Sequence, residues 1–238
     1  MLSCTQSGHD ILYGYYMNDA QVRAVELLAQ EYDYGWGAMH AHKVADLATS
    51  LFDQLDLHGL LPGLTLDDRR TLMAACYAHD IGSSPRAQVE ASTLPRWAKA
   101  LAEPDRHGEM AFHLLRSRIS TSPSERPIST FTTEERSTFL HCLLWHASSA
   151  PYVLDIEPLI DHRKALLLSG ILRIADGLDC EHRCRVRQIQ VQKASVWLRL
   201  LVRSFTSATA EVARAREKAN MLSQTLNLRL FVQEIIDG

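Results

Sequence analysis

The stretch that decides the fold is LMAACYAHDIGSSP, residues 72–85. It continues an apolar helical pattern, and its Gly-Ser-Ser-Pro run then ends the helix. His79 lies seven residues after Leu72 and three after Cys76, and Asp80 lies four after Cys76. At helical spacing both polar residues share a face with apolar neighbours, so the sequence predicts that they point into the core.

The same periodicity predicts further helices on both sides of this stretch. Helices are expected over 18–31, 39–55, 66–80, 107–118, 133–146 and 158–180, with a short helical piece at 97–101. Beyond residue 185 the segments 186–192, 195–202 and 226–232 carry the pattern of strands, and 208–223 that of a helix. We therefore expect a mainly α protein, with a helical bundle over residues 1–185 and a small α+β (β-β-α-β) appendage over 186–238.

Composition excludes several classes of protein. The 238 residues are 46% hydrophobic and 22% charged, with a formal net charge of −3, which suits a folded domain rather than a disordered chain. The balanced charge gives no basic field for nucleic acid or a membrane surface, so neither is expected as a partner. No apolar run is long enough to span a membrane, and the N-terminus lacks the features of a secretory signal.

The cysteines argue against a disulfide framework. There are five, an odd number at sparse spacing, so we expect reduced thiols and a cytoplasmic location. Cys180, His182 and Cys184 offer three candidate zinc ligands, but their spacing matches no common zinc finger. An accidental grouping at a helix end is the simpler interpretation.

Six polar residues fall on the predicted apolar faces of five helices. They are His40, His79, Asp80, His107, His146 and Asp176. A single inward histidine is usually a hydrogen-bonded core residue, whereas a buried carboxylate must be paired, protonated or bound to a metal. We see no lysine or arginine on these faces to pair with either aspartate. The set therefore favours a cation site, and imidazole with carboxylate suits Mn, Fe, Co, Ni or Zn, with Mg as a further option.

The order His, His-Asp, His, His, Asp resembles the HD-domain superfamily of metal-dependent phosphohydrolases. The segments that carry this resemblance are HAHKVADLA from residue 40, CYAHDIGSS around residue 79, RHGEMAFHLL around residue 107, LLWHASSAP around residue 146 and LRIADGLD around residue 176. It implies that His40, His79, Asp80 and Asp176 hold one metal ion, and that His107 and His146 allow a second, bridged by Asp80.

A closer resemblance, over nearly the whole chain, is to the C-terminal HD region of the exopolyphosphatase / guanosine pentaphosphate phosphatase (Ppx/GppA) family. HKVADLATSLFDQL, LRIADGLDCEH and the tail with REKAN carry it. The actin-like phosphatase lobes of that family have no counterpart here, so exopolyphosphatase activity cannot be transferred. The lysine that follows HDIG in cyclic-dinucleotide hydrolases is replaced by Ser83, and the HDxxED pattern is also absent.

These resemblances imply a hydrolase of a phosphate ester or anhydride, such as a nucleotide or a polyphosphate-like substrate, in enzyme class 3.1 or 3.6. Asp80 and His79 are its expected catalytic residues, with Lys43 and Arg173 as candidate contacts for the small-molecule phosphate substrate. The rival interpretation is a non-catalytic module that senses a nucleotide or polyphosphate. A homodimer through an edge strand of the tail is a further expectation.

Overall fold

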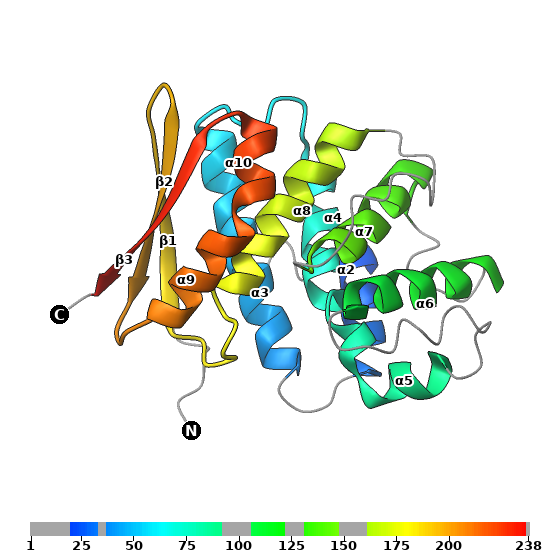
Figure 1. Ribbon diagram of the computed structural model, residues 1–238. Helices are drawn as coiled ribbons and strands as arrows, with labels where there is room; N and C mark the ends of the chain where they lie inside the picture. The colour runs from blue at the N-terminus through cyan, green and yellow to red at the C-terminus, as the bar shows by residue number, and fades with distance from the viewer. Residues whose placement is uncertain (1–19, 33–36, 92–105, 122–130, 148–160, 237–238) are drawn as a thin grey trace.

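The computed structural model describes residues 20–32, 37–91, 106–121, 131–147 and 161–236. Within these ranges the chain forms nine α-helices, one short 3₁₀ helix and three strands (Figure 1). They are α2 (Ala20–Gln30), α3 (Gly37–Leu57), α4 (Leu66–Ala78), η1 (Ile81–Ser83), α5 (Pro85–Ala91), α6 (His107–Thr121), α7 (Thr133–Trp145), α8 (His162–Gly177), β1 (Val186–Lys193), β2 (Trp197–Ser204), α9 (Thr209–Lys218), α10 (Asn220–Leu226) and β3 (Arg229–Ile236). The fold class predicted from the sequence, mainly α with a β-β-α-β tail, is confirmed.

Side-chain caps fix where the central helices begin. At the start of α4 the Thr65 hydroxyl accepts from the Asp68 backbone N–H, while the Asp68 carboxylate accepts from the Thr65 backbone N–H. Thr132 and Glu135 form the same reciprocal pair at the start of α7. Such a capping box satisfies backbone donors that have no partner inside the helix, so it sets the helix start firmly.

The tail is a three-stranded mixed sheet in the order β1-β2-β3. The β1 and β2 strands pair antiparallel, with an irregularity between Val186 and Gln188, and β2 and β3 pair parallel. Parallel neighbours need a crossover connection, and α9 and α10 provide it. The sequence predicted one helix over 208–223, whereas the structure has two helices that meet at Ala219.

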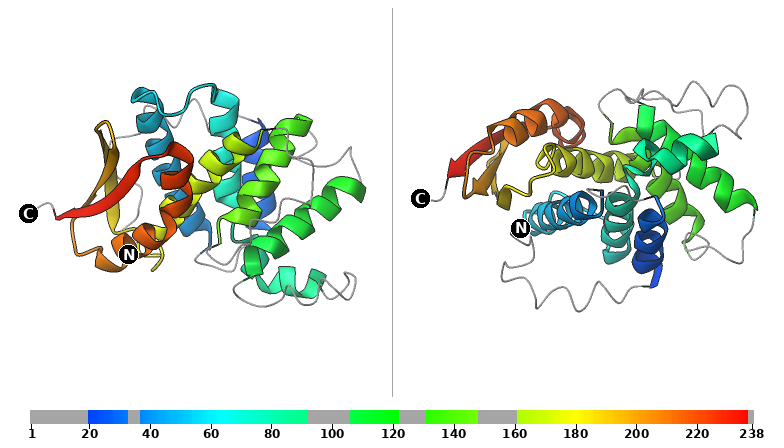
Figure 2. Two further views of the ribbon diagram at one scale, coloured as in Figure 1. Left: turned by 45° about the horizontal axis from the view of Figure 1, so that its top comes forward. Right: turned by 90° about the horizontal axis from the view of Figure 1, so that it is seen from below.

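Helix α8 lies at the centre of the molecule. It contacts α3, α4 and α7 on one side and α9 and α10 on the other, so the tail packs directly on the helical body (Figure 2). Two glycines allow this contact, because a Cβ at Gly170 would meet Leu222 of α10 at 3.0 Å and one at Gly177 would meet Ala215 of α9 at 3.0 Å. Buried apolar side chains form one continuous core through both parts.

Helix α5 is not among the helices predicted from the sequence. It begins at Pro85, since proline suits the first helical position. The short helical piece expected at 97–101 lies outside the described residues. None of the helices that the structure describes combines the length and the apolar character required to cross a membrane.

Candidate metal centre

The six predicted residues meet where several helix ends converge. His40 lies in the first turn of α3, His107 is the first residue of α6, and Asp176 lies in the last turn of α8. His79 and His146 follow directly after α4 and α7 as their C-terminal caps, and Asp80 follows His79. Side chains placed at helix ends can converge on one point without interrupting the hydrogen bonding of any helix.

Asp80 lies between two pairs of histidines. Its Oδ2 is 3.6 Å from Nε2 of His40 and 3.4 Å from Nε2 of His79. Its Oδ1 is 3.5 Å from Nε2 of His107 and 3.8 Å from Nε2 of His146. These atoms form two potential metal-binding groups, His40–His79–Asp80 and Asp80–His107–His146, which share the Asp80 carboxylate.

Asp176 completes the first of these groups. Its Oδ1 is 3.4 Å from Nε2 of His40 and 3.8 Å from Nε2 of His79, so it faces the same two nitrogen atoms as Asp80 does. One ion there would therefore have two imidazole and two carboxylate ligands available. That mixture of nitrogen and oxygen donors suits a divalent transition ion.

The outer ring nitrogens of two histidines, His79 and His146, already have hydrogen-bond partners. Nδ1 of His79 lies 2.8 Å from the Cys76 carbonyl, and Nδ1 of His146 lies 2.7 Å from the Leu143 carbonyl. Because a carbonyl oxygen only accepts, each Nδ1 carries the proton and each Nε2 keeps its lone pair for the site. Second partners of this kind orient metal-binding histidines in proteins.

Two buried nitrogen atoms test whether a metal ion fits. Nε2 of His40 and Nε2 of His79 are inaccessible to solvent and have no hydrogen-bond partner among the described residues. A buried polar atom without a partner is costly, and a metal ion aligned with its lone pair removes that cost. In the second group, His107 and His146 place their Nε2 atoms 2.9 Å apart, close enough to bind the same metal ion.

Electrostatics keep the carboxylates ionised. Burial alone would raise the pKa of Asp80, but the neighbouring imidazoles of His79, His146 and His40 hold it below its usual range. For Asp176, burial is likewise outweighed by the charge of Lys218 and by the nearby His40 imidazole, so its pKa lies well below the usual range. Both groups are therefore anionic at neutral pH, as metal ligands must be.

The histidines divide into two classes by charge. Burial lowers the pKa of His79, and it lowers the pKa of His146 to about 4, so both are neutral at pH 7. Burial also acts against charge on His40, but the carboxylates of Asp176, Asp179 and Asp80 around it outweigh burial and raise the pKa of His40 to about 10. A metal ion must therefore displace a proton from His40 before that nitrogen can bind it.

The expectation that no cation pairs with either aspartate is wrong for Asp176. The Lys218 ammonium, at the end of α9, forms an ion pair with Asp176 Oδ2, and its side chain is only 7% exposed. Lys218 is distant in sequence, and no periodicity within the segment around Asp176 could reveal it. Its charge leaves Oδ1 of Asp176 facing the histidines.

Two residues beyond the predicted ligands support His40. The fully buried Asp179 accepts from His40 Nδ1 over 2.9 Å and from the Cys184 backbone N–H over 2.7 Å. The His182 ring stacks on the His40 ring with centroids 4.0 Å apart. Sequence analysis assigned neither role, although both residues lie in the ADGLDCEH segment that carries the closer resemblance.

The two predicted cationic contacts lie in different environments. Lys43 is half-buried on α3 one turn beyond His40, and it forms no ion pair with the described residues. Arg173 is buried, and its guanidinium donates to the backbone carbonyls of Trp145 and Ala147, which flank His146. These bonds hold the end of α7 in place, so Arg173 supports the position of His146.

Glycines let the backbone segments of the site approach closely. A Cβ at Gly82 would lie 2.0 Å from the His107 carbonyl oxygen, and one at Gly108 would lie 2.7 Å from the Leu143 carbonyl oxygen. Only glycine fits both positions, because backbone atoms cannot move away as a flexible side chain can. The Gly82 contact brings His107 beside Asp80, and the Gly108 contact brings α6 onto the end of α7.

The cysteines take no part in these groups. The four cysteines among the described residues, Cys76, Cys142, Cys180 and Cys184, are free thiols. Neither metal-binding group that the described residues form includes Cys180, His182 or Cys184.

Comparisons with known proteins do not indicate a function, so a functional assignment must rest on the geometry of the site. The sequence matches no protein-family model and no curated protein. The centre itself is a set of buried histidines and aspartates that can hold metal ions.

Proposed function

We propose that this chain is a metal-dependent phosphohydrolase of the HD type, acting on a phosphate ester or anhydride. The observation that carries the proposal is the position of Asp80, with one carboxylate oxygen facing His40 and His79 and the other facing His107 and His146. A carboxylate shared between two imidazole pairs is the arrangement expected of a bridged pair of metal ions. The likeness of the motifs to HD phosphohydrolases supports the same conclusion.

In this proposal His40, His79, Asp80 and Asp176 hold one ion, and Asp80, His107 and His146 hold a second. Divalent ions supply Lewis acidity toward phosphoryl oxygens and lower the pKa of water. The chain contributes orientation, because Asp179 and the carbonyls of Cys76 and Leu143 fix the imidazole rings. The Asp80 side chain is 24% exposed, so solvent and substrate can reach the shared carboxylate. Lys43 is the nearby cation proposed to contact the phosphate.

Metal analysis of Asp80→Ala tests the ligand assignment. Protein purified without chelator is expected to hold about one or two divalent transition ions per chain and to hydrolyse members of a phosphate-ester, nucleotide and polyphosphate panel supplied with Mn, Co, Ni or Mg. Asp80→Ala should lose both properties, while Asp56→Ala, an exposed aspartate on α3, should keep both. Full metal content in Asp80→Ala would refute the assignment.

A second candidate function is a regulatory module that senses a nucleotide or polyphosphate. The specific observation that favours it is the Lys218 ammonium on Asp176, since the chain already supplies one cation to the site. Metal binding without turnover of any phosphate compound in the panel would favour this second candidate. Turnover that depends on Asp80 would favour the first.

A further inference from the structure

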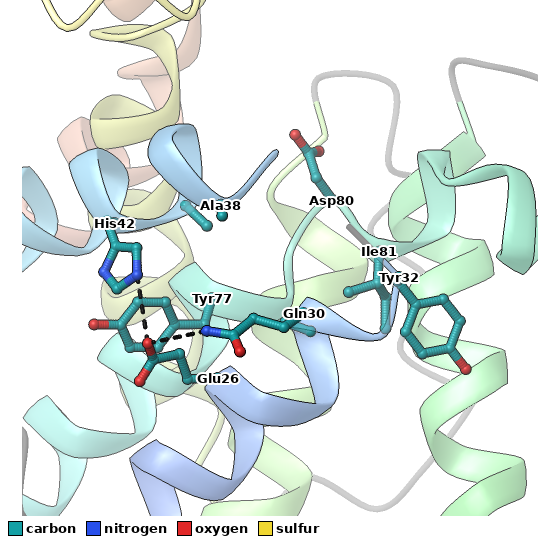
Figure 3. A pocket seen from close by; sticks show the side chains of 10 residues that line it. Glu26, Gln30, Tyr32, Ala38, His42, Tyr77, Asp80 and Ile81 are labelled. Atoms are coloured by element: carbon teal, nitrogen blue, oxygen red, sulfur yellow. Dashed lines mark hydrogen bonds and ion pairs between the residues drawn. The ribbon is translucent and has the colours of Figure 1, made fainter. Parts of the chain in front are cut away.

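A pocket opens beside the metal centre and shares Asp80 with it. Three elements enclose it: α2 and the turn after it, the first turns of α3, and the end of α4 with the residue after Asp80 (Figure 3). Its lining residues include Glu26, Tyr32, Ala41, His42, Tyr77 and Asp80. A group bound at the metal centre can therefore extend into this pocket.

The walls are mostly apolar and the space is narrow. Alanines of α2 and α3 and the isoleucine after Asp80 line it, together with Tyr32 and Tyr77. The cavity volume is about 40 Å³. Such a shape admits a small or flat apolar group and excludes a bulky one.

The charges around the pocket oppose a second anionic group. Its lining includes the carboxylates of Glu26 and Asp80, and no lysine or arginine is among the described lining residues. Arg86 lies over the Tyr32 ring, 4.9 Å from its centroid, but its guanidinium is paired with Glu31 and Glu90. A chain of phosphates entering this space would meet negative charge in apolar surroundings, which is unfavourable.

The end of the pocket away from Asp80 is polar. Glu26, whose side chain is 6% exposed, accepts from Arg23 and lies 3.4 Å from both the Gln30 amide nitrogen and the His42 Nε2 (Figure 3). The His42 ring also meets the edge of Tyr77, with centroids 5.0 Å apart. Hydrogen-bonding groups thus stand opposite the metal centre, across an apolar space.

We propose that this pocket binds the uncharged organic group of a phosphate monoester, whose phosphate lies at the metal centre. The inference rests on the proposed function and narrows its substrate class. The organic group is small or flat and apolar, with a hydrogen-bonding function directed at the Glu26, Gln30 and His42 cluster. Inorganic polyphosphate is disfavoured, because its next phosphate would occupy a pocket lined by carboxylates.

Binding of non-hydrolysable phosphonates tests this inference without relying on turnover. Full-length protein loaded with Mn²⁺ is titrated with phenylphosphonate, methylphosphonate and inorganic phosphate by calorimetry. Phenylphosphonate should bind about ten-fold or more tightly than the other two, because only its ring enters the apolar pocket. Equal affinities would overturn the inference and leave the phosphohydrolase proposal standing, whereas binding of none of the three by metal-loaded protein would overturn both.

Filling the pocket should remove this preference selectively. Ala29→Leu from α2 and Ala41→Leu from α3 narrow opposite walls, and each should abolish the advantage of phenylphosphonate while leaving methylphosphonate affinity and metal content unchanged. Ala213→Leu, at an exposed position on α9, is the matched control and should keep the preference. A preference that survives in both pocket variants, at wild-type metal content, would refute the assignment.

Discussion

Three carboxylates surround the His40 ring. Its Nε2 faces Asp80 and Asp176, and its Nδ1 bonds to the buried Asp179. These carboxylates raise the pKa of His40 to about 10 against the opposing effect of burial. The imidazolium is therefore the chain's own counterion to the carboxylates, and a divalent ion competes with a proton for the same nitrogen.

Metal uptake should accordingly release protons. At pH 7.5 we expect about one proton to be released per chain on loading with Mn²⁺. The pH lies below the raised pKa of His40, so His40 carries the proton that is lost, whereas His146 is already neutral. Calorimetry in buffers of different ionisation enthalpy measures the number. Uptake should weaken as the pH falls, since the proton then competes more strongly. Binding at full affinity with no proton released would contradict this account of His40.

At the scale of elements, α8 joins the tail to the metal centre. Gly177 lets α9 lie against it, and the last residue of α9, Lys218, pairs with Asp176 in the last turn of α8. The Lys218 carbonyl also accepts from Arg173 Nε over 3.4 Å. The tail is thus a component of the site, and its helix sets which oxygen of Asp176 faces the histidines.

Removing the ammonium should change stability and metal binding in opposite directions. Lys218→Met removes the cation that is paired with the Asp176 carboxylate, so metal-free protein should lose about 3 kcal/mol of unfolding free energy. The metal ion then has no competing cation, so the rise in Tm on adding Mn²⁺ should exceed that of wild type. Denaturant unfolding and thermal melts measure both effects.

The matched control for this test is Lys193→Met at an exposed position on β1, which should behave as wild type. An unchanged stability of metal-free Lys218→Met would show that the ion pair with Asp176 contributes little.

Some features of these elements could be predicted from the sequence, and others could not. Apolar periodicity predicted that His40, His79 and His146 point inward, and all three are buried. Alternation predicted the three strands. Local patterns report which face of an element is buried, but not which distant element covers that face. Lys218 and the pocket between α2 and α3 depend on such tertiary contacts, and they were missed for that reason.

At the scale of the whole molecule, the candidate ligands tie together five segments of one continuous core. They come from α3, the end of α4, α6, the end of α7 and α8. An ion that binds only the folded arrangement stabilises it by an amount that grows with the logarithm of the ion's concentration relative to its Kd. The metal centre is thus expected to act as a cross-link within the helical body.

Chelation should therefore lower thermal stability. Saturation at about a hundred times Kd adds about 2.7 kcal/mol, which for a chain of this size corresponds to a Tm change of about 5 to 10 °C. Differential scanning calorimetry of metal-loaded and EDTA-treated protein measures the difference. Asp80→Ala should show none, and an equal shift in that variant would place the stabilising ion elsewhere.

The parallel pairing of β2 with β3 has a consequence for biosynthesis. The crossover formed by α9 and α10 is secured only when residues 229–236 add the third strand, and α9 carries the lysine that meets Asp176. The Lys218 ammonium therefore leaves the ribosome later than every candidate ligand of the metal centre. Products that terminate after Asp176 but before Lys218 contain all of these ligands, yet lack the ammonium that sets the position of one of them.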